Sequence, residues 1–585
     1  MVSGNNLLLQ NILRLLFKQY FLIKLIIALL VALSITLDDT IVYSGNRLDC
    51  YPTNFARQIS ISEVLIFAII FVISFAALCL IQWVFLKVRE RDCVLSTISE
   101  ERQIGFVSFI KKHFGLTIIL FVEVLAGWFI VLLNYYPGTS MNDQLWVIDA
   151  PITAAASHPL VHNLILTGCV RVLGLGILGS GTAGFAVYIF FQMMFCAAVV
   201  AVCAIWLRFR GAPRWLVIGF AFLFALTPVV SNFAICAIKD TLFSYILLAW
   251  IPFVYEALYN PDNFWKKRSS FILLVLLMVF TSLIRNNGLY IALLMCVVFV
   301  VLYRKIACKK LVCACFIGLI LSFTPSFALS IMGVEQLFRE SVGIPIQQVC
   351  AVVCEDSDSL SVNQLNYIDD IMPIACIKEN YAPMSVDKIK FNQNFNTGYL
   401  QKTKSDFIRV YFEMGLSHPD EYWRSYLSQT WGFWSLRASS CTPETQSSFF
   451  SISSNMMDES LSYIMEEYNL GNYSLYPAGF SKIFDSLYRP SVEIHPGPGM
   501  LFLMVLLGGF ALICLTGSRK YVLIILPMVI LWLTLMIAVP ISSSLRYVFP
   551  MLISIPLVYA IVITKALSSR NFDQHIRKDN PTCMP

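Results

Sequence analysis

Several runs of this sequence are apolar over lengths that soluble proteins seldom contain. Val64–Phe85 and Tyr521–Val539 are two of them. A hydrocarbon core about 30 Å thick is crossed by roughly 20 apolar residues in a helix. Because backbone groups in lipid must satisfy their own hydrogen bonds, helices are the structures that cross it. We therefore expect an all-α polytopic membrane protein.

The composition supports this fold class. The 585 residues are 58% hydrophobic and 13% charged, whereas about a quarter of a soluble domain is charged. This excludes a soluble enzyme, a disordered protein and a fibre. The basic residues lie in short scattered loops rather than on one face, so no nucleic-acid partner is expected.

The apolar pattern predicts about twelve transmembrane helices. They lie near residues 16–37, 62–86, 114–134, 183–207, 215–232, 241–258, 271–285, 288–303, 311–332, 499–516, 521–539 and 548–566. Their ends are set only to within about 2–4 residues. We interpret the first as a retained helix, because the apolar region of a signal peptide is usually shorter.

The distribution of Lys and Arg orients the chain. One set of alternate segments carries 24 of them, and the other set of short loops carries only six, which are Arg47, Arg57, Arg171, Lys239, Arg285 and Arg546. Basic loops stay in the cytoplasm, so both termini are expected there, in a multi-pass protein of the plasma (cell) membrane. The alternation needs an even number of spans, so the stretch 160–180 is interpreted as an outside or re-entrant helix.

This topology predicts four regions. Residues 1–332 hold nine transmembrane helices and the outer loop 135–182 with amphipathic or re-entrant helices. Residues 333–498 form an extracytoplasmic soluble domain, 499–567 hold the last three spans, and 568–585 form a cytoplasmic tail.

The long segment 333–498 differs in charge from the rest of the chain. It holds 11 Lys and Arg and 20 Asp and Glu. Apolar residues at helical spacing, such as Val362, Leu365 and Ile368, predict a mostly helical domain. Its four cysteines either form two disulfides in an oxidising compartment or stay free; they are Cys350, Cys354, Cys376 and Cys441.

Asp143 is the first candidate for chemistry. It follows the third helix on the outside, beyond the helix-stopping Pro137-Gly138. A partly desolvated carboxylate at a membrane surface can act as a general base. The alternative is that Asp143 caps the next helix.

His158 and His162 are four residues apart, so one helical face can present both. With Asp143 they would offer ligands for a divalent cation. Orienting a phosphate or an acceptor, or making ordinary hydrogen bonds, are the alternatives, so no cofactor is certain.

Three cations mark the outer ends of other helices. Lys239, Arg285 and Arg546 are each the only Lys or Arg of their short outer loop. A cation near hydrocarbon is costly unless it pairs with an anion. That anion is either a protein carboxylate, for example Asp240 beside Lys239, or a phosphate, for which Arg offers two parallel donors.

Short stretches of the chain resemble the GT-C superfamily of membrane glycosyltransferases, specifically bacterial members of unassigned specificity. The stretches are Tyr136–Gln144, His158–Asn163, Lys239–Phe243, Arg285–Gly288 with Asn286, Glu340–Gln348 and Arg546-Tyr547. The resemblance runs from about 130 to 550. Two extra helices precede the shared core, and Asn142 stands before Asp143 where better-known members carry a paired acid.

The resemblance implies a sugar carried on polyprenyl phosphate or diphosphate and moved, outside the cytoplasm, to a hydroxyl of a cell-surface glycan, lipid or protein. It maps the base onto Asp143 and the donor phosphate onto the cations, with Asp240, Asn286, His158, His162 and Tyr547 nearby. Transfer would invert the sugar carbon. The alternatives are a glycan polymerase or ligase that uses lipid-linked sugars, a twelve-helix transporter or lipid flippase, and a non-enzymatic receptor.

Overall fold

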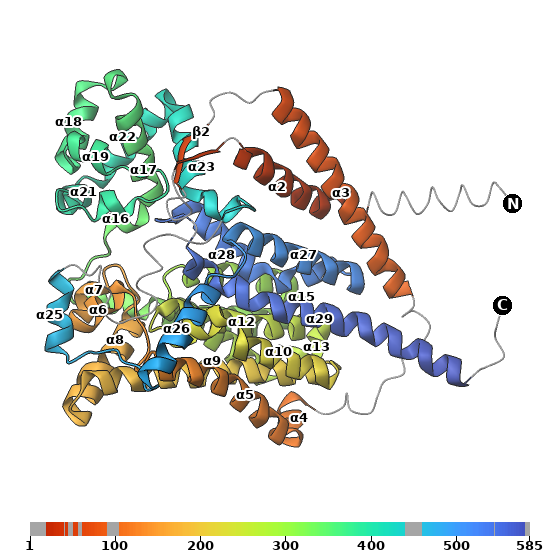
Figure 1. Ribbon diagram of the computed structural model, residues 1–585. Coiled ribbons are helices and arrows are strands. Elements are labelled where there is room, and N and C mark those ends of the chain that lie inside the picture. Colours follow the sequence, from red (N-terminus) through yellow and green to blue (C-terminus); the bar gives the residue numbers. More distant parts are fainter. Residues whose placement is uncertain are drawn as a thin grey trace.

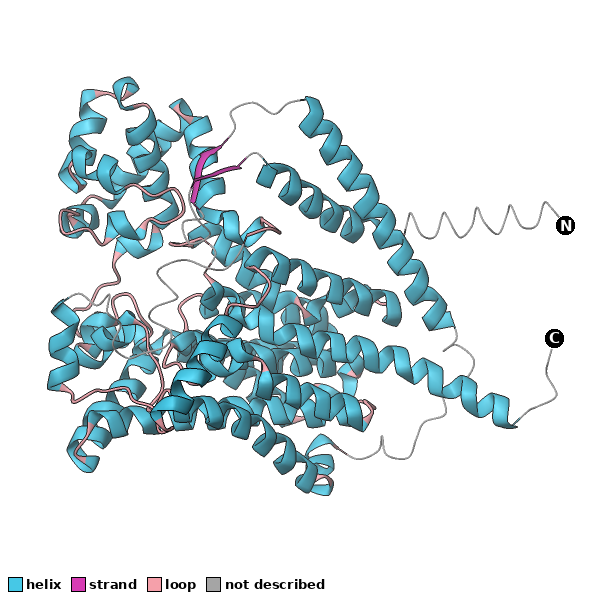
Figure 2. Ribbon diagram, in the orientation of Figure 1, coloured by secondary structure: helices cyan, strands magenta, loops and turns pink. Residues whose placement is uncertain are grey.

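The computed structural model describes residues 19–39, 41–44, 51–55, 61–90, 105–438, 459–542 and 544–579. Helices make up almost all of its regular structure (Figure 2). The exception is one antiparallel pair of short strands, β1 (Ile41–Ser44) and β2 (Tyr51–Phe55). The chain is an all-α membrane protein, as its apolar runs predict.

Every predicted transmembrane segment coincides with helix in the described residues. The helices concerned are α2 (Phe21–Asp39), α3 (Ile61–Glu90), α5 (Phe114–Asn134), α9 (Gly181–Phe209), α10 (Arg214–Leu226), α11 (Pro228–Ala234), α12 (Lys239–Tyr259), α14 (Arg268–Ile284), α15 (Gly288–Ile331), α27 (Pro498–Thr516), η5 (Arg519–Ile524), α28 (Leu526–Ala538) and α29 (Leu545–Asp579). Shorter helices connect them, namely α4 (Phe106–Lys112), α6 (Asn142–Asp149), α7 (Pro151–Ala154), α8 (Leu160–Thr167), η2 (Gly168–Leu178) and α13 (Pro261–Phe264).

Eight helices among the described residues are long and apolar enough to cross a membrane, or nine if α10 and α11, bent by 67°, count as one span. The eight include 160–178, where α8 runs on into η2. By its length this helix belongs with the candidate spans. The charge alternation in the sequence needs an even number of spans and for that reason predicts an outside or re-entrant helix here. Twelve spans and the side on which each terminus lies stay predictions.

Helix α15 is a hairpin of two antiparallel helices rather than one rod. Its backbone leaves helical geometry at Tyr303 and Ala307. On one side of this break, the Cys296 Sγ lies 3.3 Å from the Met278 Sδ of α14. On the other side, a Cβ on Gly318 would lie 2.7 Å from the methyl carbon of the same Met278. Residues 22 positions apart would be about 33 Å apart in a straight helix, so the two predicted segments 288–303 and 311–332 fold back on each other.

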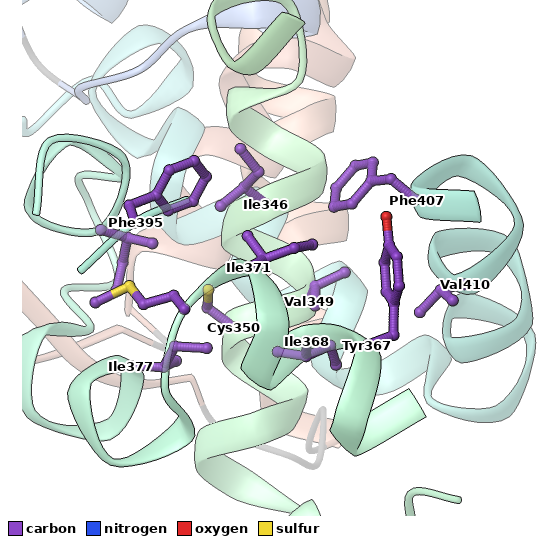
Figure 3. A pocket seen from close by; sticks show the side chains of 12 residues that line it. Ile346, Val349, Cys350, Tyr367, Ile368, Ile371, Ile377, Phe395, Phe407 and Val410 are labelled. Atoms are coloured by element: carbon purple, nitrogen blue, oxygen red, sulfur yellow. The ribbon is translucent and has the colours of Figure 1, made fainter. Parts of the chain in front are cut away.

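An inserted domain, which we define as Phe338–Trp434, has its own hydrophobic core. Its helices are α16 (Phe338–Ser341), α17 (Gly343–Glu355), η3 (Ser357–Ser359), α18 (Val362–Ile371), α19 (Ile374–Asn380), α20 (Asp387–Lys390), α21 (Thr397–Lys402), α22 (Lys404–Ser417) and α23 (Pro419–Trp434). The side chains around α17 enclose an apolar cavity of about 20 Å³ (Figure 3). A space of that size holds about one water molecule, so it is a packing void of the core. The predicted helical character of this segment is confirmed.

The rest of segment 333–498 packs on the transmembrane bundle instead. Helices α25 (Glu459–Glu467) and α26 (Ala478–Val492) share the main hydrophobic core with the membrane helices. Between them, the Tyr473 N–H donates to the Tyr136 carbonyl at 2.8 Å, and the Leu475 N–H donates to the Leu133 carbonyl at 2.8 Å. The predicted soluble domain 333–498 is therefore divided between two locations.

The cysteines of the inserted domain are not joined by disulfides in the described residues. Cys350 is buried, and Cys354 and Cys376 are partly buried; all three are free thiols. Burial raises the pKa of the Cys354 thiol to about 11, which keeps it protonated. Cys441 lies outside the described residues.

The two ends of the bundle carry different structures (Figure 1). The inserted domain lies at one end, together with α6, α7 and α25. The C-terminal ends of α3 and α29 lie at the other end. Since α14 begins at Arg268 and ends just before Arg285, these two arginines lie at opposite ends of the bundle.

Candidate functional site

The polar residues singled out from the outer helix ends converge at the end of the bundle that faces the inserted domain. Asp143 lies in α6, His158 lies just before α8, and Lys239 and Asp240 begin α12. Arg285 follows α14, and Arg546 and Tyr547 begin α29. The convergence predicted from sequence is present, because direct contacts link these residues in pairs.

Backbone hydrogen bonds join the loop at Thr139 to the loop at Ala237, and this contact positions Asp143 and Lys239. The Thr139 N–H donates to the Ile235 carbonyl at 2.9 Å, and the Ala237 N–H donates to the Thr139 carbonyl at 2.9 Å. Gly138 adopts φ +126°, and a Cβ there would lie 2.7 Å from the Ile235 carbonyl oxygen. Only glycine fits this left-handed, crowded position. Asp143 and Lys239 follow directly after the joined loops.

Asp143 and Arg546 form the first pair. The Arg546 Nη1 lies 3.2 Å from the Asp143 Oδ2 and 3.5 Å from the Met141 Sδ. The other terminal nitrogen donates to the Tyr547 hydroxyl at 3.2 Å. The Asp143 side chain is 35% exposed and that of Arg546 is 16% exposed. The carboxylate is therefore neutralised on one side and open to solvent on another.

The charges around Asp143 decide its protonation. Burial acts to raise the pKa of this carboxyl, but the guanidinium of Arg546 and the other cations nearby outweigh burial and hold the pKa well below its ordinary value. Asp143 is consequently ionised across the physiological pH range as long as Arg546 stays beside it.

Lys239 and His158 form the second pair. The Lys239 ammonium lies 2.6 Å from the His158 Nδ1, so the lysine donates and the imidazole accepts. The positive charge of Lys239, together with burial, lowers the pKa of His158 to about 3. His158 is therefore a neutral acceptor that fixes the position of the lysine.

His162 is not part of this pair, although it lies close enough for the charges of Lys239 and Asp240 to act on it. It is buried, and its Nε2 lies 3.0 Å from the hydroxyl of Tyr188, which in turn donates to Gln192 at 3.2 Å. The expectation that one helical face presents His158 and His162 together is wrong, because the helix α8 begins only at Leu160 and His158 lies in the preceding turn.

The candidate metal ligands do not form a metal centre. No group of three or more His, Cys, Asp or Glu side chains suited to a metal occurs within the described ranges. The carboxylate of Asp143 is directed to Arg546 and the Nδ1 of His158 to Lys239. This donor set, with a cation on Asp143 and on His158 and the Tyr188 hydroxyl on His162, does not fit a divalent cation.

Asp240 and Arg285 form a third pair, and it is buried. Their Oδ1 and Nη1 lie 2.8 Å apart, with side chains 2% and 8% exposed. The guanidinium also lies against the rings of Phe243 and Tyr547, at 5.3 and 5.1 Å. The sequence left two alternatives for Lys239, a pair with Asp240 or separate partners for the two residues, and the side chain of Asp240 pairs with Arg285. Asn286 is exposed beside it, and its side chain makes no hydrogen bond to the described residues.

The group as a whole carries a surplus of positive charge. Lys239, Arg285 and Arg546 are cations, Asp143 and Asp240 are anions, and His158 is neutral at physiological pH. The formal charge is therefore +1, at the end of an otherwise apolar helix bundle. Such a group favours an anion.

The inserted domain reaches this group through a segment that the sequence did not single out. The Val386 N–H donates to the Pro540 carbonyl at 3.1 Å, and the Ser542 N–H donates to the Met384 carbonyl at 2.9 Å. Asp387 and Lys390 of α20 thereby come close enough for their charges to act on Arg546 and Tyr547. No local pattern in Ser385–Lys390 marks these residues, because the contact joins parts of the chain about 150 residues apart.

The comparisons with known proteins give a family without an assigned activity. No curated protein and no solved structure matches the chain. A family described as a family of unknown function (DUF6020) matches residues 144–576. This match covers well over half of the 585 residues, from the position after Asp143 to the last turns of α29. The chain belongs to this family.

Proposed function

We propose that this protein is an integral membrane glycosyltransferase of GT-C type, with cytoplasmic termini. The donor is a sugar on polyprenyl phosphate or diphosphate, and the acceptor is a hydroxyl on the extracytoplasmic side. The identity of the donor and the GT-C fold rest on the resemblance of the short motifs. The chemistry rests on the group of residues at the end of the bundle.

The observation that carries the proposal is the Asp143–Arg546 pair. It combines a carboxylate that is 35% exposed with a guanidinium held by two further contacts, to Met141 and Tyr547. A base for the acceptor and a donor of hydrogen bonds for a phosphate thus lie 3.2 Å apart. Their position at a bundle end suits a lipid-linked substrate, whose polar head lies at the membrane surface.

The proposed reaction is a direct displacement. The phosphate of the donor contacts Arg546 and Lys239. It takes the place of Asp143 beside Arg546, so Asp143 loses its ion-pair partner. Asp143 then takes the proton from the acceptor hydroxyl while the acceptor oxygen bonds the anomeric carbon. The bond from that carbon to the phosphate oxygen breaks, and polyprenyl phosphate leaves with the electron pair. The cations stabilise the growing negative charge, and the sugar carbon is inverted.

The roles of the two arginines differ in this reaction. Arg546 is partly exposed and is the direct phosphate ligand. Arg285 is 8% exposed and already neutralised by Asp240, so it acts by holding Tyr547 and the start of α12 in place. Lys239 is held by a neutral histidine, so its charge is free to act on the phosphate.

Transfer by the purified full-length chain tests the proposal. The chain in lipid nanodiscs is mixed with radiolabelled polyprenyl-phosphate hexoses and pentoses and with membranes of cells that lack its gene. We expect Asp143→Asn to lose at least about 100-fold in transfer, while it still binds farnesyl phosphate. Asp406→Asn, at an exposed carboxylate of the inserted domain, is the matched control.

Three outcomes count against the proposal or change it. Absence of transfer by the wild-type chain with every donor contradicts it. Transfer near the wild-type rate by folded Asp143→Asn removes Asp143 as the base and favours the polymerase or ligase mechanism, in which arginines act without this acid. Movement of the lipid-linked sugar between leaflets without transfer favours the flippase.

A further inference from the structure

A third carboxylate, that of Asp387, approaches the site from the inserted domain. We propose that Asp387 binds the acceptor and orients its hydroxyl toward Asp143, so that the inserted domain supplies the acceptor-binding wall of the site. This inference rests on the proposed function and adds a residue and a substrate class to it. The acceptor is a polyhydroxyl compound such as a glycan, because a carboxylate accepts hydrogen bonds from neighbouring hydroxyls.

Hydrogen bonds fix the inserted domain to the residues that precede α29. Besides the two backbone bonds of Met384 and Val386 to the loop 540–542, Gln429 of α23 donates to the Val539 carbonyl at 2.8 Å. The Ser542 hydroxyl accepts a hydrogen bond from the Gly432 N–H at 2.8 Å. Helix α23 and the segment just before α20 thus both bind the residues that lead into α29. The position of α20 relative to Arg546 is set by four hydrogen bonds.

Asp387 is held in place by Lys390 of its own helix. The Lys390 ammonium lies 2.7 Å from the Glu340 Oε2 and 3.4 Å from the Asp387 Oδ1. Arg339 lies 3.4 Å from the other oxygen of Glu340. The Lys390 side chain is 4% exposed, whereas that of Asp387 is 22% exposed. Lys390 is thus a buried positioning residue shared by two carboxylates, and Asp387 keeps an open side.

Asp387 and Asp143 are both within range of the Arg546 charge, yet their environments differ. Burial raises the pKa of Asp387 and outweighs the charges of Lys390 and Arg546. The pKa of Asp143 is held well below its ordinary value instead. Two acids whose environments push their pKa values apart are suited to different tasks. Asp143 is paired with a cation that the donor needs, and Asp387 is paired with a cation that belongs to the inserted domain.

Charged and titratable groups on three helices surround Asp387. Lys390 lies in its own helix α20, Glu340 lies in α16, and Arg546 and Tyr547 lie in α29. Of these, Lys390 lowers the pKa of Asp387 more than Arg546 does. Removal of the Lys390 charge is therefore expected to raise the pKa of Asp387 and to leave the Asp143–Arg546 pair in place.

The test measures transfer by the full-length chain in nanodiscs at varied acceptor concentration. For Asp387→Asn we expect the acceptor KM to rise about tenfold, as for loss of a hydrogen bond to a charged group. Binding of farnesyl phosphate is expected to stay within twofold of wild type. Asp387→Glu is expected to recover part of the loss, and Asp406→Asn is the control on the same domain.

A pH profile separates this role from a structural one. In Lys390→Gln, the acid limb of kcat/KM for the acceptor is expected to move to higher pH, because Asp387 then ionises at higher pH. This measurement decides the matter if Asp387→Asn does not fold. An unchanged acceptor KM in folded Asp387→Asn, or an unmoved acid limb in Lys390→Gln, overturns the inference and leaves the glycosyltransferase standing. Absence of transfer by the wild-type chain overturns both.

Discussion

The two ends of the helix bundle both carry cations, but they hold most of them in different ways. At the end that faces the inserted domain, Arg285 and Arg546 are paired with carboxylates, and Lys239 is paired with a histidine. At the other end, Arg210 is paired with Glu256, but seven further cations lie exposed on two adjacent turns, and no ion pair to a described residue holds them. They are Lys266, Lys267, Arg268, Arg304, Lys305, Lys309 and Lys310. Contact between the rings of Trp265 and Tyr303, which are tilted by 50° with centroids 5.3 Å apart, joins the two turns.

This difference indicates two different roles for a cation at a membrane boundary. An exposed lysine at the headgroup level needs no protein partner, and its main effect is on the orientation of the chain. A buried arginine is retained only when its charge is balanced. A specific chemical role is therefore expected for the three cations of the candidate site, of which Arg285 and Arg546 are balanced by carboxylates. The seven exposed cations serve as internal controls.

The largest expected effect is on transfer. Arg546→Gln removes the phosphate contact and leaves the Asp143 carboxylate without its partner, so the transfer rate is expected to fall at least about 100-fold. Arg304→Gln makes the same chemical change at the exposed end and is expected to leave the rate within about twofold of wild type. Equal effects of the two variants would erase the proposed distinction between the ends.

The next effect is on stability. Asp240→Asn leaves Arg285 buried without a counter-charge and is expected to lower the free energy of unfolding by about 3–5 kcal/mol. The control is Glu256→Gln, which breaks the pair with Arg210 at the opposite end of α12, where the side chains are 16% and 25% exposed. This change is expected to cost about 1 kcal/mol. Thermal unfolding of the full-length chains in nanodiscs gives the order, and a reversed order contradicts the importance assigned to burial.

The smallest effect concerns pH. His158 has a folded-state pKa of about 3, below its unfolded value of about 6.5, so only the unfolded chain takes up this proton between these values. Stability is therefore lost as pH falls below about 6.5. His158→Gln, which keeps an acceptor for Lys239, is expected to lose about 1–2 kcal/mol less than wild type between pH 7 and pH 5. A wild-type-like dependence in this variant would show that His158 is charged in the folded chain.

Much of the fold follows from the sequence, because apolar runs of about 20 residues report helices directly. The run of Arg304, Lys305, Lys309 and Lys310 separated the two halves of α15 correctly, since cations cannot lie in mid-membrane. The convergence of Asp143 with Arg546 was also predictable, because helix ends on one side of a membrane share one plane. The status of 160–178 was not, because charge counting gives only the parity of the spans.

The partners of the candidate residues were harder to predict. Lys239 and Asp240 are adjacent in the chain, yet they point to His158 and Arg285, because successive side chains at a helix start diverge by about 100°. The approach of Asp387 and Lys390 depends on how a whole domain docks, and no local pattern records that. The packing of α25 and α26 on the bundle was missed for the same reason.

The hydrogen bonds between Met384, Val386 and the loop 540–542 have a mechanical consequence. Ser542 lies four positions before Arg546, so a rotation of the inserted domain pulls on the first turn of α29 and on the guanidinium that it carries. Any graft that exchanges this domain for a foreign one must keep that seam intact. We expect a small antibody fragment that separates Met384 and Val386 from the loop 540–542 to abolish the proposed activity without contacting a charged side chain.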